Sequence, residues 1–137
     1  MRSRKPILLV EDDYVDVLTV KRALHEINLQ NDIVVAGNGE EALEYLDNPK
    51  NERPSIILLD LNMPRMNGIE FLQKVKNIDK HKIIPVIVLT TSSQEKDRME
   101  SFKSSVAGYM TKPVIYSEFV EVMKTIDKYW TCSDMPI

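Results

Sequence analysis

The chain has 137 residues with 18 basic and 21 acidic side chains, a formal net charge of −3, so it can form one domain with a sizeable core but not a second catalytic or DNA-binding domain. The basic residues are scattered beyond the start of the chain, and no apolar run approaches the roughly 18 residues of a membrane span, so neither nucleic acid nor membrane is an expected partner. A single cysteine, Cys132, excludes an internal disulfide and favours a cytoplasmic location, and no targeting segment follows the basic residues 1–5.

The first half of the chain alternates between apolar runs and helical periods. Residues 6–10 form an apolar run that ends in the acidic triplet 11–13, and residues 32–36 form another, so two strands are predicted. A short helix is predicted over 40–46, with acidic residues in its first turn. The helix between the two strands begins at Tyr14, and its apolar stripe is Val17, Val20, Leu24 and Ile27.

The second half begins with the run 55–59, which leads into Asp60. A continuous apolar run of this kind is typical of a strand buried on both faces of a parallel sheet, although a lone Asp here could also be a turn or capping residue. A helix opens at Asn67 and fades by Asp79, and further strands are predicted over 85–90 and 106–111. Ser117 is predicted to cap the last helix.

The helix after residue 90 has an unusually polar sequence. Ser92 and Glu95 have the spacing of a capping box, and only Met99 and Phe102 are apolar enough to anchor the helix. We therefore expect this helix to be weakly held and easily moved. His25 and His81 show no ligand spacing and are interpreted as surface residues.

Five strands that alternate with five helices predict an α/β fold with a doubly wound parallel sheet and helices on both faces. The domain is expected to span residues 1–130, with a short tail over 131–137. In such a sheet the carboxyl ends of the strands share one edge, where ligands bind.

That edge should collect five polar residues, listed here: Asp12, Asp13, Asp60, Thr90 and Lys112. Two like charges about 4 Å apart repel by roughly 4 kcal/mol at an effective dielectric near 20, so the acids require counter-charge. One lysine is not enough, and Mg²⁺ is the natural complement. A carboxylate nucleophile, a metal, and hydroxyl and ammonium donors are the parts that phosphoryl transfer requires.

Over residues 5–130 the sequence resembles the receiver domain of two-component response regulators. The resemblance rests on Val-Glu-Asp-Asp at 10–13, Leu-Asp-Leu-Asn-Met-Pro at 59–64, Asn67-Gly68, Leu-Thr-Thr at 89–91 and Lys112-Pro113. It implies a flavodoxin-like strand order 2-1-3-4-5. It also implies a phosphoacceptor signalling protein that catalyses only its own phosphorylation and dephosphorylation, with a sensor histidine kinase or a histidine phosphotransfer protein as partner.

The resemblance also implies roles for single residues. Asp60 accepts the phosphoryl group, while Asp13, Asp60 and the carbonyl of Asn62 ligate Mg²⁺, with Asp12 acting through water. Thr90 and Lys112 hold the phosphate, and Lys112-Pro113 is joined by a cis peptide bond.

Tyr109 would be the switch aromatic of the family. Phosphorylation would draw Thr90 toward the phosphate and let Tyr109 turn inward, which reshapes the face made by the fourth helix, fifth strand and fifth helix. Ser105-Val106 and Val114 depart from common family residues on this face, so the partner and the amplitude of the switch stay open.

The ending over residues 126–130 is similar to stand-alone receivers that work with phytochrome-type or hybrid histidine kinases. Its Tyr129-Trp130 pair is either a core edge or a dimer contact, and a homodimer through the switch face is favoured.

The lifetime of the phosphorylated form is implied to depend on Asn62 and Ser92. Both side chains are small and neutral, so neither supplies a strong base nor shuts water out, and a lifetime of the order of minutes is expected.

Three other functions fit the sequence less well. A phosphatase of the dehalogenase type needs a second acid where this chain has Asn62. A flavodoxin-like electron carrier needs a phosphate-binding loop where this chain has the acidic triplet 11–13. A pseudo-receiver only binds partners and has no need of the acidic residues, so the intact acidic set argues against this function.

Overall fold

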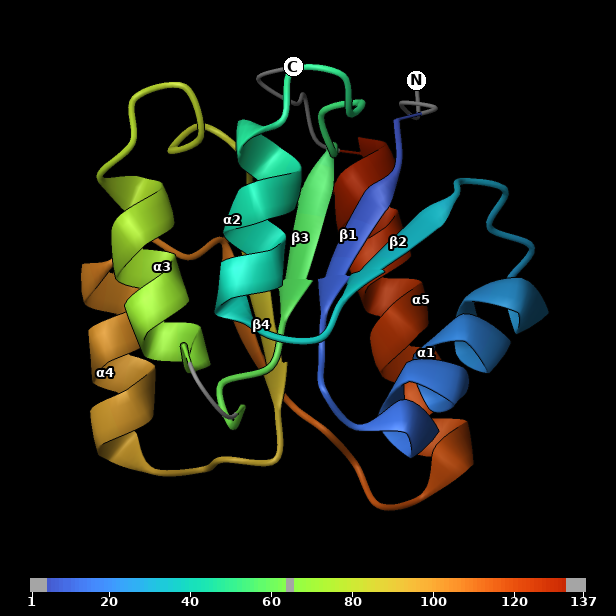
Figure 1. Cartoon of the computed structure of the whole chain (residues 1–137). Helices are drawn as coiled ribbons and strands as arrows, with labels where there is room; N and C mark the ends of the chain where they lie inside the picture. The colour runs from blue at the N-terminus through green and yellow to red at the C-terminus, as the bar shows by residue number, and fades with distance from the viewer. Residues whose placement is uncertain (1–4, 64–65, 133–137) are drawn as a thin grey trace.

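The short apolar runs of the sequence become the strands of one parallel sheet in the computed structural model of the chain, which describes residues 5–63 and 66–132 (Figure 1). The strand order is β2-β1-β3-β4-β5, and every neighbouring pair is parallel. The predicted fold class and strand order are therefore confirmed. The strands are β1 (Ile7–Val10), β2 (Ile33–Ala36), β3 (Ile56–Leu59), β4 (Val86–Thr90) and β5 (Gly108–Thr111).

The three central strands, β1, β3 and β4, are buried along their whole length, whereas the edge strands β2 and β5 are partly exposed. Continuous apolar runs suit the centre of the sheet because helices cover both of its faces. Burial of the strands on both faces also leaves their carboxyl ends as the place where polar side chains can meet.

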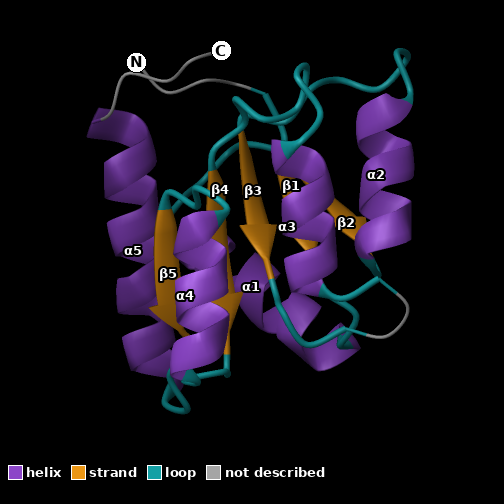
Figure 2. Cartoon of the chain, turned by 90° about the vertical axis from the view of Figure 1, so that its left-hand side faces the viewer, coloured by secondary structure: helices purple, strands orange, loops and turns teal. Residues whose placement is uncertain are grey.

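Helices α1 and α5 lie on one side of the sheet, and α2, α3 and α4 lie on the other (Figures 1 and 2). Each side encloses its own hydrophobic core. Trp130 is only 2% exposed in the core under α1 and α5, so it is a core residue, while its neighbour Tyr129 is 39% exposed. The helices are α1 (Tyr14–Glu26), α2 (Gly39–Asp47), α3 (Gly68–Lys76), α4 (Glu95–Lys103) and α5 (Tyr116–Cys132).

Three helices begin at a residue whose side chain accepts hydrogen bonds from their first turn: Asp13 for α1, Asn38 for α2 and Asn67 for α3. Gly68, the first residue of α3, lies against the end of β3. A Cβ atom there would lie 2.4 Å from the carbonyl oxygen of Asp60 and 2.5 Å from the Cα of Leu61. The start of α3 is thus packed directly onto the residue at the end of the central strand.

The predictions for α4 are wrong in two respects. Its N-cap is Gln94, not Ser92, and no side chain caps it, because the Ser92 hydroxyl bonds to the carboxylate of Asp97 instead. The expected anchors Met99 and Phe102 are 52% and 53% exposed. Ser101 is the buried residue of this helix, so α4 contributes little apolar surface to the core.

Two further predictions need correction. His81 is buried at 4% exposure, not on the surface, because its Nε2 lies 2.8 Å from Oδ1 of Asp47 at the end of α2. Ser117 does not cap the last helix, since α5 already begins at Tyr116. His25 is exposed, as predicted.

Some predicted features lie outside the described residues, among them most of the basic start, Pro64 of the motif that follows Asp60, and residues 133–137 of the expected tail. The last helix, α5, extends to Cys132, two residues past the expected domain boundary at 130. Within the described ranges, no helix combines the length and apolar character needed to cross a membrane.

Candidate functional site

Backbone pairing continues past the ends of the central strands and brings the predicted site residues together. The N–H of Asp60 donates to the carbonyl of Val10 at 3.0 Å, and the N–H of Lys112 donates to the carbonyl of Thr90 at 2.7 Å. Asp60 therefore lies beside the end of β1, and Lys112 lies beside the end of β4. Asp60 is 7% exposed, which is unusual for a carboxylate and is a consequence of its place after a fully buried strand.

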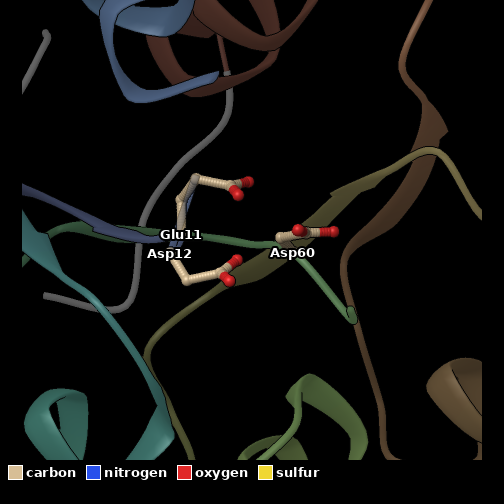
Figure 3. A group of neighbouring side chains, drawn as sticks. All are labelled: Glu11, Asp12 and Asp60. Atoms are coloured by element: carbon tan, nitrogen blue, oxygen red, sulfur yellow. The ribbon is translucent and has the colours of Figure 1, made fainter. Parts of the chain in front are cut away.

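Three carboxylates gather at this edge: those of Glu11, Asp12 and Asp60, each of which offers an oxygen within 4.8 Å of the other two (Figure 3). Glu11 is buried and Asp12 is exposed. The cluster therefore opens to solvent on the side of Asp12. Asp12 and Asp60 were predicted for this edge, but Glu11 was not.

Asp13, which was predicted to lie in the cluster, is placed elsewhere by the structure. Its Oδ1 accepts hydrogen bonds from the N–H groups of Val15 at 2.8 Å and Asp16 at 3.2 Å, so the side chain caps α1. The acidic triplet 11–13 spans the turn from strand to helix, and the sequence does not reveal which two of its side chains point toward Asp60. Of the two predicted acids, the structure brings Asp12 but not Asp13 into the cluster with Asp60.

Lys112 is the cation of the site, with a side chain only 7% exposed. Its Nζ lies 2.8 Å from Glu11, 3.2 Å from Asp16 and 3.9 Å from Asp60. Asp16 was not predicted as a site residue, and its only signal in the sequence is an acidic side chain in the first turn of α1. The expected cis bond between Lys112 and Pro113 is wrong, because the described residues contain no cis peptide.

The buried ion pair affects the protonation of both of its partners. Burial alone would lower the pKa of Lys112, but its hydrogen bond to Glu11 and the charges of the nearby carboxylates raise that pKa above its ordinary value. Burial raises the pKa of Glu11 to about 7, against the opposing effect of its hydrogen bond to Lys112. Lys112 is therefore firmly charged in this structure.

Thr90, Ser92 and Tyr109 form a connected group beside the acidic cluster. Thr90 is fully buried, and its hydroxyl oxygen accepts a hydrogen bond from the N–H of Ser92 at 3.3 Å. The hydroxyl of Tyr109 donates to the carbonyl of Ser92 at 2.9 Å, with the ring half-buried. These contacts join the end of β4, the loop before α4 and β5.

Asn62 is exposed just beyond Asp60, and its N–H donates to Oδ1 of Asp60 at 3.4 Å. Asn62 is therefore accessible to solvent next to the carboxylate of Asp60.

The donor set at this edge fits a hard divalent cation. The cluster offers carboxylate oxygens and no sulfur or imidazole ligand, which suits Mg²⁺ or Mn²⁺. One ammonium group, that of Lys112, does not neutralise three clustered acids. A cation beside Asp12 and Asp60 would balance this charge.

The chain is similar to known proteins in both sequence and fold. The family model of the response regulator receiver domain matches residues 7–124. The response regulator Rcp1 of Synechocystis sp. is 34% identical over 130 residues, which cover 92% of this chain and 88% of Rcp1. The crystal structure of the phosphorylated cyanobacterial phytochrome response regulator RcpA is similar with a TM-score of 0.91 and 34% identity, covering 98% of this chain and 100% of RcpA. The Mn²⁺-bound form of Rcp1 gives a TM-score of 0.89 and 33% identity, covering 97% and 99%.

Proposed function

Because this chain belongs to the response regulator receiver domain family, we propose that it accepts a phosphoryl group on Asp60 from a sensor histidine kinase or a histidine phosphotransfer protein. One observation carries the proposal. Asp60 is a buried carboxylate at the end of the central strand, between an acidic cluster and the ammonium group of Lys112. This combination supplies a nucleophile, a cation site and a donor in one place.

In the proposed reaction, an oxygen of Asp60 attacks the phosphorus of a phosphohistidine. A P–O bond to Asp60 forms while the P–N bond breaks, and the imidazole leaves with the electron pair of the broken bond. Dephosphorylation transfers the same group to water, so the chain acts on itself and has no separate substrate. We therefore regard the protein as a signalling protein, not an enzyme.

Asp12, Asp60 and the backbone carbonyl of Asn62 would hold Mg²⁺, with Glu11 taking the supporting role first assigned to Asp12. When bound, the ion supplies positive charge to the phosphoryl oxygens. The Mn²⁺-bound form of Rcp1 supports the proposal that this chain also binds a divalent cation. Asp13 is left with its structural role as the cap of α1.

Lys112 and Thr90 would hold the remaining phosphoryl oxygens through an ammonium and a hydroxyl group. Thr90 already contacts the loop to which Tyr109 is bonded, so its movement toward a phosphoryl group would be felt at Tyr109. The proposed output is a rearrangement of the face formed by α4, β5 and α5. The small buried surface of α4 supports this role, because moving the helix disrupts few contacts.

Asn62 and Ser92 are proposed to set the lifetime of the phosphorylated form. Asn62 has no titratable group, and the Ser92 hydroxyl is already bonded to Asp97, so neither is a base. A lifetime of the order of minutes is the expectation.

Two relatives support a choice of partner. RcpA is a phytochrome response regulator, and Rcp1 is a response regulator of similar length. We therefore propose a phytochrome-type or hybrid histidine kinase as phosphodonor and a cytoplasmic location. We also propose a homodimer through the α4, β5 and α5 face, where Met99 and Phe102 are exposed.

The test is phosphorylation by a small-molecule phosphodonor in the presence of Mg²⁺, followed by intact-mass analysis and peptide mapping. One added phosphoryl group on Asp60 is expected, and Asp60→Asn should abolish it. An adduct of the same mass in Asp60→Asn would falsify the assignment.

A further inference from the structure

We propose that Asp16 is a positioning residue, which holds the ammonium group of Lys112 in a resting place that phosphorylation of Asp60 must disrupt. The inference rests on the proposed phosphorylation of Asp60 and adds a residue to that reaction. Asp16 lies in the first turn of α1, and Lys112 follows β5, so the pair connects two elements that are far apart in the sequence.

The hydrogen-bonding capacity of Lys112 defines the resting place. An ammonium group has three N–H donors, and two short contacts are present, at 2.8 Å to Glu11 and 3.2 Å to Asp16. The 3.9 Å distance to Asp60 is too long for a hydrogen bond. In this structure Lys112 is therefore bonded to two carboxylates other than that of the phosphoacceptor.

A phosphoryl group on Asp60 would change this balance. It brings strong acceptor oxygens and negative charge next to Lys112, and the ammonium group must turn toward them. The third N–H of Lys112 can turn to these oxygens, but to close the 3.9 Å distance the Nζ atom must move toward Asp60, which lengthens one of its two present contacts.

Exposure decides which partner yields. The Glu11 side chain is 2% exposed, so water cannot replace Lys112 as its partner and this shorter contact is the harder of the two to break. The Asp16 side chain is 40% exposed and can exchange Lys112 for water at little cost. Asp16 therefore favours the unphosphorylated arrangement and is the contact that phosphorylation breaks.

The position of Asp16 is itself fixed by the fold. Its N–H donates to Oδ1 of Asp13, the cap of α1, which sets the first turn of the helix. A cavity of about 450 Å³ lies next to this contact, with Asp16, Lys112 and Arg22 among its lining residues. Loss of the contact between Asp16 and Lys112 would remove the ion pair that links α1 to the loop after β5 beside this cavity.

The experiment measures the affinity of the full chain for beryllium trifluoride, a phosphoryl mimic, in saturating Mg²⁺ by fluorine NMR or calorimetry. Asp16→Asn should bind the mimic about two- to fivefold more tightly, the gain expected when a partly exposed competing ion pair is removed. The free energy of unfolding should change little, because Asn keeps the shape of the side chain and the backbone N–H that bonds to Asp13.

Two controls separate this mechanism from a general effect of charge. Asp13→Asn removes the same charge three residues away without touching Lys112 and should leave the affinity unchanged. In a Lys112→Met background, Asp16→Asn should also have no effect, which is the signature of a residue that acts through Lys112.

The inference is overturned if Asp16→Asn binds the mimic no more tightly than the wild type, or if Asp13→Asn gives the same gain. A wild-type chain that neither binds the mimic nor is modified at Asp60 would overturn the proposed function, and the role of Asp16 with it.

Discussion

Asp12 and Asp13 are neighbours with different tasks, and single substitutions separate them. Asp12→Ala should weaken Mg²⁺ binding at least about tenfold, because it removes one carboxylate of the acidic cluster that is proposed to hold the ion. Asp13→Ala should leave Mg²⁺ binding intact and lower the free energy of unfolding by about 1 kcal/mol, because it removes the cap of α1. Calorimetric titration with Mg²⁺ and urea denaturation measure the two effects.

Asp13→Asn is the matched control, since an amide oxygen can still accept the two N–H groups of the cap. It should restore stability. If Asp13→Ala lost Mg²⁺ binding, Asp13 and not Glu11 would belong to the Mg²⁺ site.

Ser92 offers a test of the phosphoryl lifetime at the scale of one side chain. Ser92→Lys or Ser92→Arg should slow the release of labelled phosphate, because a long side chain on the loop next to Thr90 would cover the approach of water to Asp60. The exposed neighbour Ser93 supplies the control, and Ser93→Lys should leave the rate unchanged. Equal rates for Ser92→Lys and the wild type would show that Ser92 does not line the path of the water.

At the scale of elements, the contact between His81 and Asp47 ties the end of α2 to the loop after α3. Asp47→Ala would leave the buried imidazole of His81 without its 2.8 Å acceptor and should lower the free energy of unfolding by about 1–3 kcal/mol. Urea denaturation measures the change. His25→Ala, at an exposed position, should stay within about 0.5 kcal/mol of the wild type. A similarly small effect of Asp47→Ala would mean that water replaces the acceptor.

The elements themselves were largely predictable because their signals are local. Apolar runs marked all five strands, and helical spacing marked α1 and α3. The start of α4 was not predictable, because the hydroxyl of Ser92 chooses between the backbone and Asp97 only in the folded chain. The burial of His81 depends on a residue 34 positions earlier in the sequence, which no local pattern reveals.

The residues of the candidate site also divide into those that local sequence signals predict and those that depend on the folded chain. Asp60, Thr90 and Lys112 end strands or follow them directly, so the parallel sheet placed them correctly. Glu11, Asp13 and Asp16 lie where the chain turns from β1 into α1, and the direction of each side chain depends on that turn. The sequence predicted the edge of the sheet but not which acids of this turn face it.

At the scale of the whole molecule, the exposed side chains of α4 predict an assembly. Phe102→Lys should weaken the proposed homodimer at least about tenfold, because it places a charge on an aromatic contact at the α4 face. Sedimentation velocity with and without beryllium trifluoride measures the dimer. Ile83→Lys, at a similarly exposed apolar residue on the loop before β4, should have no effect. A wild-type chain that stays monomeric in both states would rule out the dimer.

Gly68 has a consequence for how this domain can vary. Since a methyl group there would come within 2.4 Å of the Asp60 carbonyl, the chain tolerates hydrogen and nothing larger at that position while α3 keeps its place. A side chain there would push α3 away and tilt the peptide that carries Asp60. Packing alone therefore restricts a residue that has no side chain of its own to contribute to the chemistry.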